Sequence, residues 1–305
     1  MNTFERFKQS YFLFSFKRDP IAVISATIFS ILFIISMLAP VIAPHDPYDM
    51  ATIDILDAET PPVWMDGGEK RFLLGTDIQG RDLLSTMLYG LRTSVIIGLG
   101  SVVLQAIIGI IIGLTAGYFG GKIDTFLMRV TDIQFSIPYL IVAIIIMAIL
   151  QLTLGMGAFE KFAMPRLIII IAVSHWPCYA RTVRASVLGE KNKEYVEAAR
   201  VIGLSSRLIM YRHILPNCLT PVLVLSTIQV AESIMSEAAL SFLGLGMPIS
   251  QPSLGSLIRA GFEYIFSGSW WITIFPGILL VVFTLVIILF GDFLRDVLNP
   301  KLYKG

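Results

Sequence analysis

Six long apolar stretches, separated by polar segments, divide this chain of 305 residues. They are residues 21–43, 94–119, 132–159, 167–180, 218–243 and 271–291. An α-helix rises about 1.5 Å per residue, so about 20 apolar residues cross the hydrocarbon core of a bilayer. The pattern therefore predicts an all-α, polytopic membrane protein with six transmembrane helices.

The first and fourth stretches differ most from an average span. Residues 21–43 carry no charge in 23 residues and follow a basic segment, which favours an uncleaved first helix over a removed signal peptide. Residues 167–180 provide only 14 uncharged positions, so this span must extend into its neighbours. Pro177 is expected to bend it, and Pro138 is expected to kink the third span.

Three glycines of the second stretch are spaced four residues apart, which places them on one face of a helix. They are Gly109, Gly113 and Gly117. Small residues at this spacing allow a second membrane helix to approach closely. We therefore expect a tightly packed partner helix along this face.

The segment at 44–92 is rich in turn residues and is predicted to be an extracytoplasmic loop region after the first helix. Near its end, Asp77 is a candidate cap for a short helix. Its apolar face would consist of Leu83, Leu84, Met87, Leu88 and Leu91. Such a helix is expected to lie in the membrane interface. The remaining divisions are an N-terminal segment 1–20, a core of five helices at 93–295 and a C-terminal tail 296–305.

Two smaller features concern the ends of the spans. Asp124, Arg129 and Asp132 are expected to form a polar cluster where a short turn at 120–131 meets the third span. Trp270 and Trp271 are expected to anchor the sixth span at the membrane interface, where tryptophan is enriched.

The distribution of positive charge predicts the orientation in the membrane. Sixteen of the 23 lysines and arginines lie in the termini and in the connections at 120–131 and 181–217. The other seven lie in the three remaining connections. Because cytoplasmic segments carry the excess of lysine and arginine, both termini are predicted to be cytoplasmic.

The composition excludes some classes of function. The chain is 55% hydrophobic and 15% charged, with a net charge of +1, so it lacks the concentrated basic face of a nucleic-acid binder. It contains no Walker A sequence, and no catalytic or metal-ligand constellation stands out around His45 or elsewhere. We therefore expect no enzyme activity, metal or bound cofactor in this chain. Cys178 and Cys218 are expected to be free, buried thiols.

The polar stretch at 181–217 interrupts the apolar pattern with seven basic residues. Tyr195, Ala198, Ala199 and Ile202 share one helical face. Gly203 is expected to end that helix in a left-handed conformation. Ser205 can cap a second helix, which Pro216 is expected to stop. The same stretch also fits a basic loop that only fixes the topology.

Three ionisable side chains within the spans are candidates for a functional lining: Glu232, Glu237 and His175. Ionisable groups in lipid are costly, so they normally face a cavity or a partner. The glutamates lie five residues apart and therefore point in somewhat different directions. Each of the three also fits a structural role, in which it forms hydrogen bonds between helices.

The motif Glu197-Ala198-Ala199, followed by Gly203 and Leu215-Pro216, resembles the EAA loop of ATP-binding cassette importer permeases. The chain departs from that motif at His213, where the family has isoleucine; Ile214 is next. Residues 74–85 and 240–246 resemble the branch of this family that transports peptides and nickel. The resemblance runs from about residue 18 to the C-terminus.

The resemblance implies a permease subunit in the cytoplasmic or inner membrane of a bacterium or archaeon. Its loop at 186–217 would form the coupling helix, with Tyr195, Glu197, Ala198, Ala199, Gly203, Leu215 and Pro216 contacting the ATPase. Implied partners are a second homologous permease, an extracytoplasmic binding protein and two ATPase subunits that use ATP and Mg²⁺. Peptides are the expected cargo, and nickel or another small solute is the alternative.

Two other classes of membrane protein remain open. An ion-coupled secondary transporter would need an ion site near the bilayer midplane, for which Glu232 and His175 are the candidates. A membrane scaffold without transport activity would leave the EAA-like spacing unexplained. Copurification of an ATPase distinguishes the importer from both.

Overall fold

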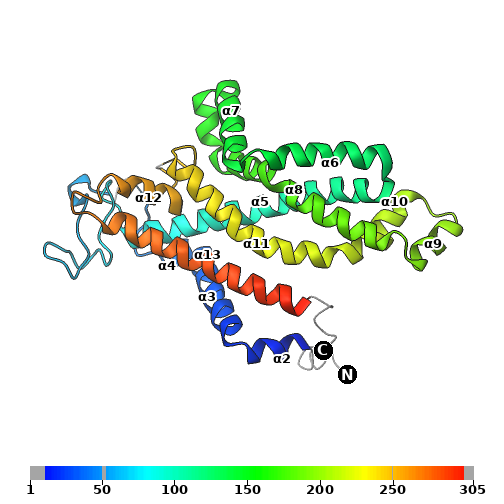
Figure 1. Ribbon diagram of the computed structural model, residues 1–305. Helices are drawn as coiled ribbons and strands as arrows, with labels where there is room; N and C mark the ends of the chain where they lie inside the picture. The colour runs from blue at the N-terminus through cyan, green and yellow to red at the C-terminus, as the bar shows by residue number, and fades with distance from the viewer. Residues whose placement is uncertain (1–10, 50–52, 249, 299–305) are drawn as a thin grey trace.

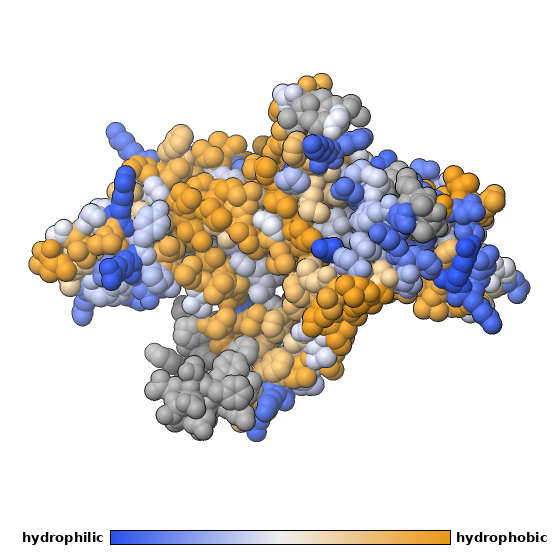
Figure 2. All heavy atoms as spheres, turned by 180° about the vertical axis from the view of Figure 1, so that it is seen from behind, coloured by the Kyte–Doolittle hydropathy of each residue, from blue (hydrophilic) through white to orange (hydrophobic). Residues whose placement is uncertain are grey.

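The computed structural model describes residues 11–49, 53–248 and 250–298, and all regular elements named within these ranges are helices. Five helical runs are long and apolar enough to cross a membrane, and a bent pair of helices makes a sixth if it counts as one span. These observations confirm the all-α, polytopic fold class. Figure 2 shows apolar residues over the central part of one face and hydrophilic residues gathered toward its two ends.

The centre of the fold consists of three long helices packed side by side: α5 (Leu83–Phe119), α8 (Ala163–Glu190) and α11 (Leu215–Phe242). Helix α13 (Trp271–Leu298) packs against α11, and α3 (Pro20–Met37) packs against α13. Figure 1 shows α3 diverging from the other long helices toward the short helix α2 (Tyr11–Arg18).

Glycines bring α5 and α8 into close contact, as the sequence predicts. A Cβ added at Gly113 would lie 2.5 Å from the carbonyl oxygen of Ala180, and one at Gly117 would lie 2.8 Å from Val187. A Cβ at Gly109 would overlap Tyr179. The backbones therefore approach to a distance that only glycine permits along this face.

The first predicted span is interrupted near its end. Helix α3 ends at Met37, and the one-turn helix α4 (Ala39–Ile42) follows, with proline at its start. Pro40 has no N–H to continue the helical ladder, and its ring excludes the carbonyl four residues earlier. The start of α3 is capped by Asp19, which accepts hydrogen bonds from Ile21 N at 3.0 Å and Ala22 N at 3.1 Å.

The predicted interfacial helix is wrong as a separate element, because its residues form the first turns of the 37-residue helix α5. Leu83 and Leu91 are fully buried, and Leu83 packs with Leu257 and Trp271 inside the protein rather than against a bilayer surface. The cap is Asp82, which accepts from Ser85 N at 2.8 Å. Asp77 instead forms a buried ion pair with Arg81 in the preceding loop, 2.6 Å between oxygen and nitrogen.

That loop contains one short 3₁₀ helix, η1 (Ile55–Asp57). Residues 44–49, at the start of the predicted extracytoplasmic region, follow Ala43, the C-cap of α4, and contain no helix or strand, only turns and bends.

The third predicted span is two helices set at 95° to one another, α6 (Gly121–Ser136) and α7 (Tyr139–Lys161). The break lies at Ile137-Pro138, because the proline forces the residue before it into the extended conformation observed at Ile137. All but the first residue of the predicted turn at 120–131 therefore belong to helix α6. Figure 1 shows α6 alongside α5 and α8, and α7 projecting away from them.

The predicted polar cluster of Asp124, Arg129 and Asp132 is also wrong, since both aspartates pair with α8. Asp124 binds the Arg184 guanidinium, with 2.6 Å between Oδ2 and Nη2, and Asp132 binds Arg181 at 2.7 Å. Neither partner was recognisable from the sequence, because each lies 49 or more residues away.

The fourth and sixth spans are longer than predicted: α8 has 28 residues and accommodates Pro177 inside the helix, and α13 also has 28. The connection between the fifth and sixth predicted spans contains helix α12 (Leu254–Phe262), capped reciprocally by Ser253 and Ser256. Trp271 is buried and donates from Nε1 to the Thr76 carbonyl at 3.2 Å, so it does not act as an interfacial anchor. Trp270 is partly exposed.

Candidate coupling site

The polar stretch between α8 and α11 forms a compact projection at one end of the molecule (Figure 1). It consists of α9 (Glu194–Val201), the one-turn helix α10 (Ser206–Leu208) and a π-helical segment, η2 (Ile209–Ile214), that leads into α11. The projection therefore has the predicted order of helix, corner and helix.

A hydrogen-bond network fixes the first turn of α9 to both neighbouring helices. The Tyr195 hydroxyl donates to Glu190 Oε2 at 2.6 Å and accepts from Asn217 Nδ2 at 3.1 Å. Lys193 Nζ donates to the other Glu190 oxygen at 2.6 Å. Burial and the adjacent Glu190 carboxylate raise the pKa of Tyr195 to about 12, so the hydroxyl remains a donor at a pH where an ordinary tyrosine ionises.

The buried face of α9 is not the face that the sequence singles out. Val196 and Ala199 are buried against a cluster formed by α5, α8, η2 and α11. Ala198 and Glu197 are exposed, and Ile202 is 73% exposed. Of the predicted stripe, only Ala199 enters the core, so most of the stripe remains available to another protein.

Gly203 ends α9 as predicted, with a φ of +79°. Its N–H donates to the Arg200 carbonyl at 3.0 Å, and the Leu204 N–H donates to Ala199 at 3.1 Å. These two bonds form a Schellman motif, in which the left-handed residue is usually glycine. Ser205 then accepts from Leu208 N at 3.4 Å, as expected of a helix cap.

Pro216 does not stop the second helix, contrary to the prediction. The helical run continues from Ser206 to Phe242, with the π-helical segment directly before α11. A π-helical turn is wider than an α-helical one, which accommodates a proline that cannot donate and whose ring needs room. Leu215 is partly buried against the cluster under α9, whereas Pro216 is exposed.

The departure from the EAA motif at His213 changes little in the packing. Ile214 is fully buried in the cluster, and His213 is only partly buried. The neighbouring isoleucine therefore supplies the apolar contact beneath α9.

Residues that the sequence analysis did not select connect this projection to α5. Lys191 Nζ donates to the Gly117 carbonyl at 2.9 Å, near the C-terminal end of α5. The Arg200 guanidinium lies 5.7 Å from the centre of the Tyr118 ring. The sequence analysis also did not select Glu190 and Asn217, which bond to Tyr195. Only their positions beside the motif could have drawn attention to them.

The three ionisable candidates within the spans lie in different surroundings. Glu232 is exposed on α11, whereas Glu237 is fully buried at the far end of the same helix. His175 Nε2 lies 3.2 Å from Ser236 Oγ, and its ring centre lies 4.8 Å from that of Tyr139. The structure thus does not bring the three together into one site.

Sequence comparisons identify the family of this architecture. Residues 109–304 match the family described as binding-protein-dependent transport system inner membrane components. Residues 10–62 match the N-terminal transmembrane domain of oligopeptide transport permease C. The chain belongs to the binding-protein-dependent transport system inner membrane components. It is therefore a multi-pass membrane subunit of an ATP-binding cassette transporter, which works with ATPase and other subunits.

Similar proteins of this family are dipeptide permeases by name. The di/tripeptide transport system permease protein of Pseudomonas aeruginosa is 40% identical over 267 residues, covering 88% of this chain and 84% of that protein. The dipeptide permease of Haemophilus influenzae is 38% identical over 291 residues, covering 95% and 94%. A solved inward-facing structure of the MetNI methionine transporter shares the fold, with a TM-score of 0.56, 21% identity and coverage of 70% of this chain and 97% of that chain.

Proposed function

We propose that this inner membrane component forms half of a translocation pathway for peptides and couples it to ATP hydrolysis through the projection at 186–217. A second, homologous permease completes the pathway, and an extracytoplasmic binding protein delivers the peptide. ATP and Mg²⁺ are used by two separate ATPase subunits. This chain itself carries out no catalysis and binds no cofactor.

The observation that carries the proposal is an apolar tip, Val201 and Ile202, on a projection that hydrogen bonds hold in place. Val201 is 87% exposed and Ile202 is 73% exposed, directly before the glycine corner. Exposed apolar side chains at a polar end of a membrane protein indicate a protein contact. The network of Glu190, Tyr195 and Asn217 below the tip resists its movement relative to α8 and α11.

The names of the relatives favour peptides as the cargo, since those similar over most of the chain are named as dipeptide or di/tripeptide permeases. Nickel or another small solute is the second candidate, because residues 74–85 and 240–246 resemble the branch of the family that transports nickel as well as peptides.

The charge distribution supports an orientation with both termini and the projection in the cytoplasm, where the ATPase subunits bind. Residues 1–10 and 299–305, including the C-terminal lysines, lie outside the described residues. In this orientation the loop between α4 and α5 faces the binding protein.

The glycine corner provides a direct test of the coupling role. In Gly203→Val, a residue with a Cβ must adopt a left-handed conformation, which costs roughly 1 kcal/mol or more. No atom lies within 4 Å of the added Cβ, so the membrane helices are unaffected. We expect the chain to insert normally but to bind its ATPase about tenfold more weakly, or to lose the coupling of hydrolysis to transport. Pull-down of the ATPase and substrate-stimulated hydrolysis in reconstituted membranes measure this.

Gly277→Val is the matched control, because Gly277 also has no atom within 4 Å of its added Cβ but lies inside α13, outside the projection. It is expected to behave as the wild type. Normal ATPase binding, hydrolysis and transport by Gly203→Val would show that this projection is not the coupling element.

Glu232 is the candidate for contact with cargo, because an exposed carboxylate on a membrane helix requires a cavity or a partner. If it receives the ammonium group of a peptide, Glu232→Gln lowers the transport rate by about tenfold while the assembled complex persists. Uptake of labelled dipeptide into proteoliposomes measures the rate, with Asp66→Asn in the exposed outer loop as control. Unchanged uptake would reject the lining role, and loss of the assembled complex would assign Glu232 to assembly.

A further inference from the structure

Helix α12 packs against both α5 and α11 where these two helices meet. The side chain of Glu237 lies at this junction, since it bonds to serines of α5 and α11. Glu237 is fully buried. The serine hydroxyls around it come from three elements: Ser94 of α5, Ser241 of α11 and Ser253 at the start of α12. A buried carboxyl is costly unless hydrogen bonds satisfy it, so this junction depends on those donors.

Two hydrogen-bond chains end on the two oxygens of Glu237. The Leu254 N–H donates to Ser94 Oγ at 3.4 Å, and Ser94 Oγ donates to Glu237 Oε2 at 2.8 Å. The Met247 N–H donates to Ser241 Oγ at 3.4 Å, and Ser241 Oγ donates to Oε1 at 2.6 Å. Because a backbone N–H can only donate, each serine accepts from the backbone and directs its own proton to the carboxylate.

The chains connect the carboxylate to the first turn of α12. Leu254 is the first residue of that helix, and Ser253, its cap, donates to Ser241 Oγ at 3.2 Å. The positive end of a helix favours a nearby carboxylate. The two helices also touch closely, since a Cβ added at Gly255 would lie 2.5 Å from the Ala238 Cα. Removing the Glu237 carboxylate therefore weakens the attachment of α12 to both α5 and α11.

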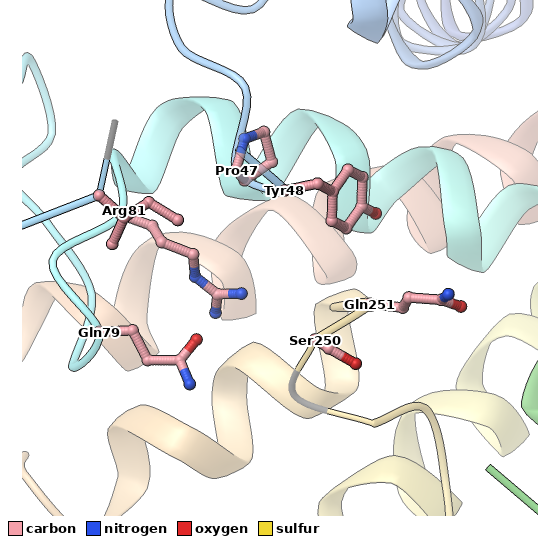
Figure 3. Close-up of a pocket in the computed structure, with 7 residues that line it drawn as sticks. Pro47, Tyr48, Gln79, Arg81, Ser250 and Gln251 are labelled. Carbon is pink, nitrogen blue, oxygen red and sulfur yellow. The ribbon is translucent and has the colours of Figure 1, made fainter. Parts of the chain in front are cut away.

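The position of α12 also sets one wall of an outer cavity of about 490 Å³. The cavity is lined by Pro47, Tyr48, Ile53, Gln79, Arg81, Ser250 and Gln251. Figure 3 shows Ser250 and Gln251 on the side opposite Gln79 and Arg81. Ser250 and Gln251 lie three and two residues before Ser253, the cap of α12, so the cavity wall is expected to move when the helix moves.

We propose that Glu237 is a positioning residue that holds α12 against α5 and α11 and thereby fixes the wall of the outer cavity. Its two oxygens accept from donors on different elements, and no apolar or amide side chain reproduces that arrangement. An amide places a donor where one of the serines must donate, so Glu237→Gln loses one of the two chains.

A cysteine beneath α12 reports whether the helix stays in place. Thr273 of α13 is buried under Gly261 of α12, and its hydroxyl has no hydrogen-bond partner, so Thr273→Cys removes no hydrogen bond. The free thiols are first removed as Cys178→Ala and Cys218→Ala. The rate of reaction with a membrane-impermeant maleimide is then measured in the assembled transporter, in intact cells and in inverted membrane vesicles.

Glu237→Gln is expected to raise the labelling rate by about tenfold or more, which is the effect of leaving one buried donor unsatisfied. Ser94→Ala removes the chain through α5, both the hydroxyl that donates to Glu237 and the acceptor of the Leu254 N–H, and is expected to raise the rate in the same direction. Glu263→Gln is the matched control, because this exposed glutamate also caps α12, at its other end. It is expected to leave the rate unchanged.

The proposal is overturned if Thr273→Cys stays as protected in Glu237→Gln and Ser94→Ala as in the parent. If Glu237→Gln fails to assemble, the labelling rate of Thr273→Cys in Ser94→Ala decides whether the proposal stands. The side of the membrane on which α12 lies rests on the proposed function, so labelling from inverted vesicles alone would contradict the orientation while supporting the positioning role. Neither outcome depends on whether the cargo is a peptide.

Discussion

Gly113→Leu is expected to prevent the assembly of a stable transporter, the largest effect we anticipate for a single change. Even the Cβ would lie 2.5 Å from the Ala180 carbonyl oxygen and 2.8 Å from Val183, both on α8. A backbone carbonyl cannot move aside as a flexible side chain can, so α5 and α8 must separate. Overpacking of a well-packed core costs about 1–3 kcal/mol, and occasionally more, so we expect Gly113→Ala to lower the free energy of unfolding by about 2 kcal/mol. Leucine adds three more carbon atoms at the same place.

Thermal denaturation and size-exclusion chromatography of the detergent-solubilised complex measure this effect. Gly277→Ala is the matched control, because Gly277 lies within the membrane helix α13 and has no atom within 4 Å of its added Cβ. A midpoint for Gly113→Ala equal to that of Gly277→Ala would refute the close α5–α8 contact.

The second large effect is expected at the apolar tip of the projection. The double change Val201→Asp and Ile202→Asp should abolish detectable ATPase binding, because each carboxylate would be forced into an apolar protein contact without a partner. Removing a central interface anchor costs 2 kcal/mol or more, and two together amount to a loss of about 1,000-fold or more in affinity. Both side chains are exposed, so the membrane helices should remain as stable as in the wild type.

Titration of the solubilised permease with its ATPase measures the affinity, and thermal denaturation tests the stability. Glu194→Gln is the control, since Glu194 is exposed in the first turn of the same helix, at the other end from the tip. Binding by the double variant at wild-type affinity would place the ATPase contact elsewhere on the chain.

The glycine corner was predictable because its signal is local. A helix-favouring segment followed by Gly203 and the cap Ser205 is enough to specify a Schellman motif and a second helix. The buried side of α9 was not predictable in the same way. Val196 and Tyr195 are both apolar enough to be buried, and the choice depends on a cluster assembled from α5, α8 and α11.

Helix α6 shows a second reason for failure. Its charges, including Lys122 and Asp124, suggest a polar turn when they are read alone. The structure neutralises Asp124 and Asp132 with arginines of α8, so a charged helix can lie beside the apolar ones. Helix α12 was missed because nine residues are too few for a periodic apolar pattern to stand out from the loop that contains it.

The unbroken helix α5 limits where residues can be inserted into the chain or deleted from it. It runs for 37 residues between the caps Asp82 and Gly120, and its C-terminal end lies beside the projection that Lys191 joins to it. Inserting one residue into such a helix rotates everything beyond it by about 100°. An insertion between Ser94, which meets Glu237, and Gly113, which meets Ala180, would turn one of these contacts away from its partner. Natural insertions and deletions are therefore expected to accumulate in the segment between α4 and α5 and to be absent from the span between these two contacts.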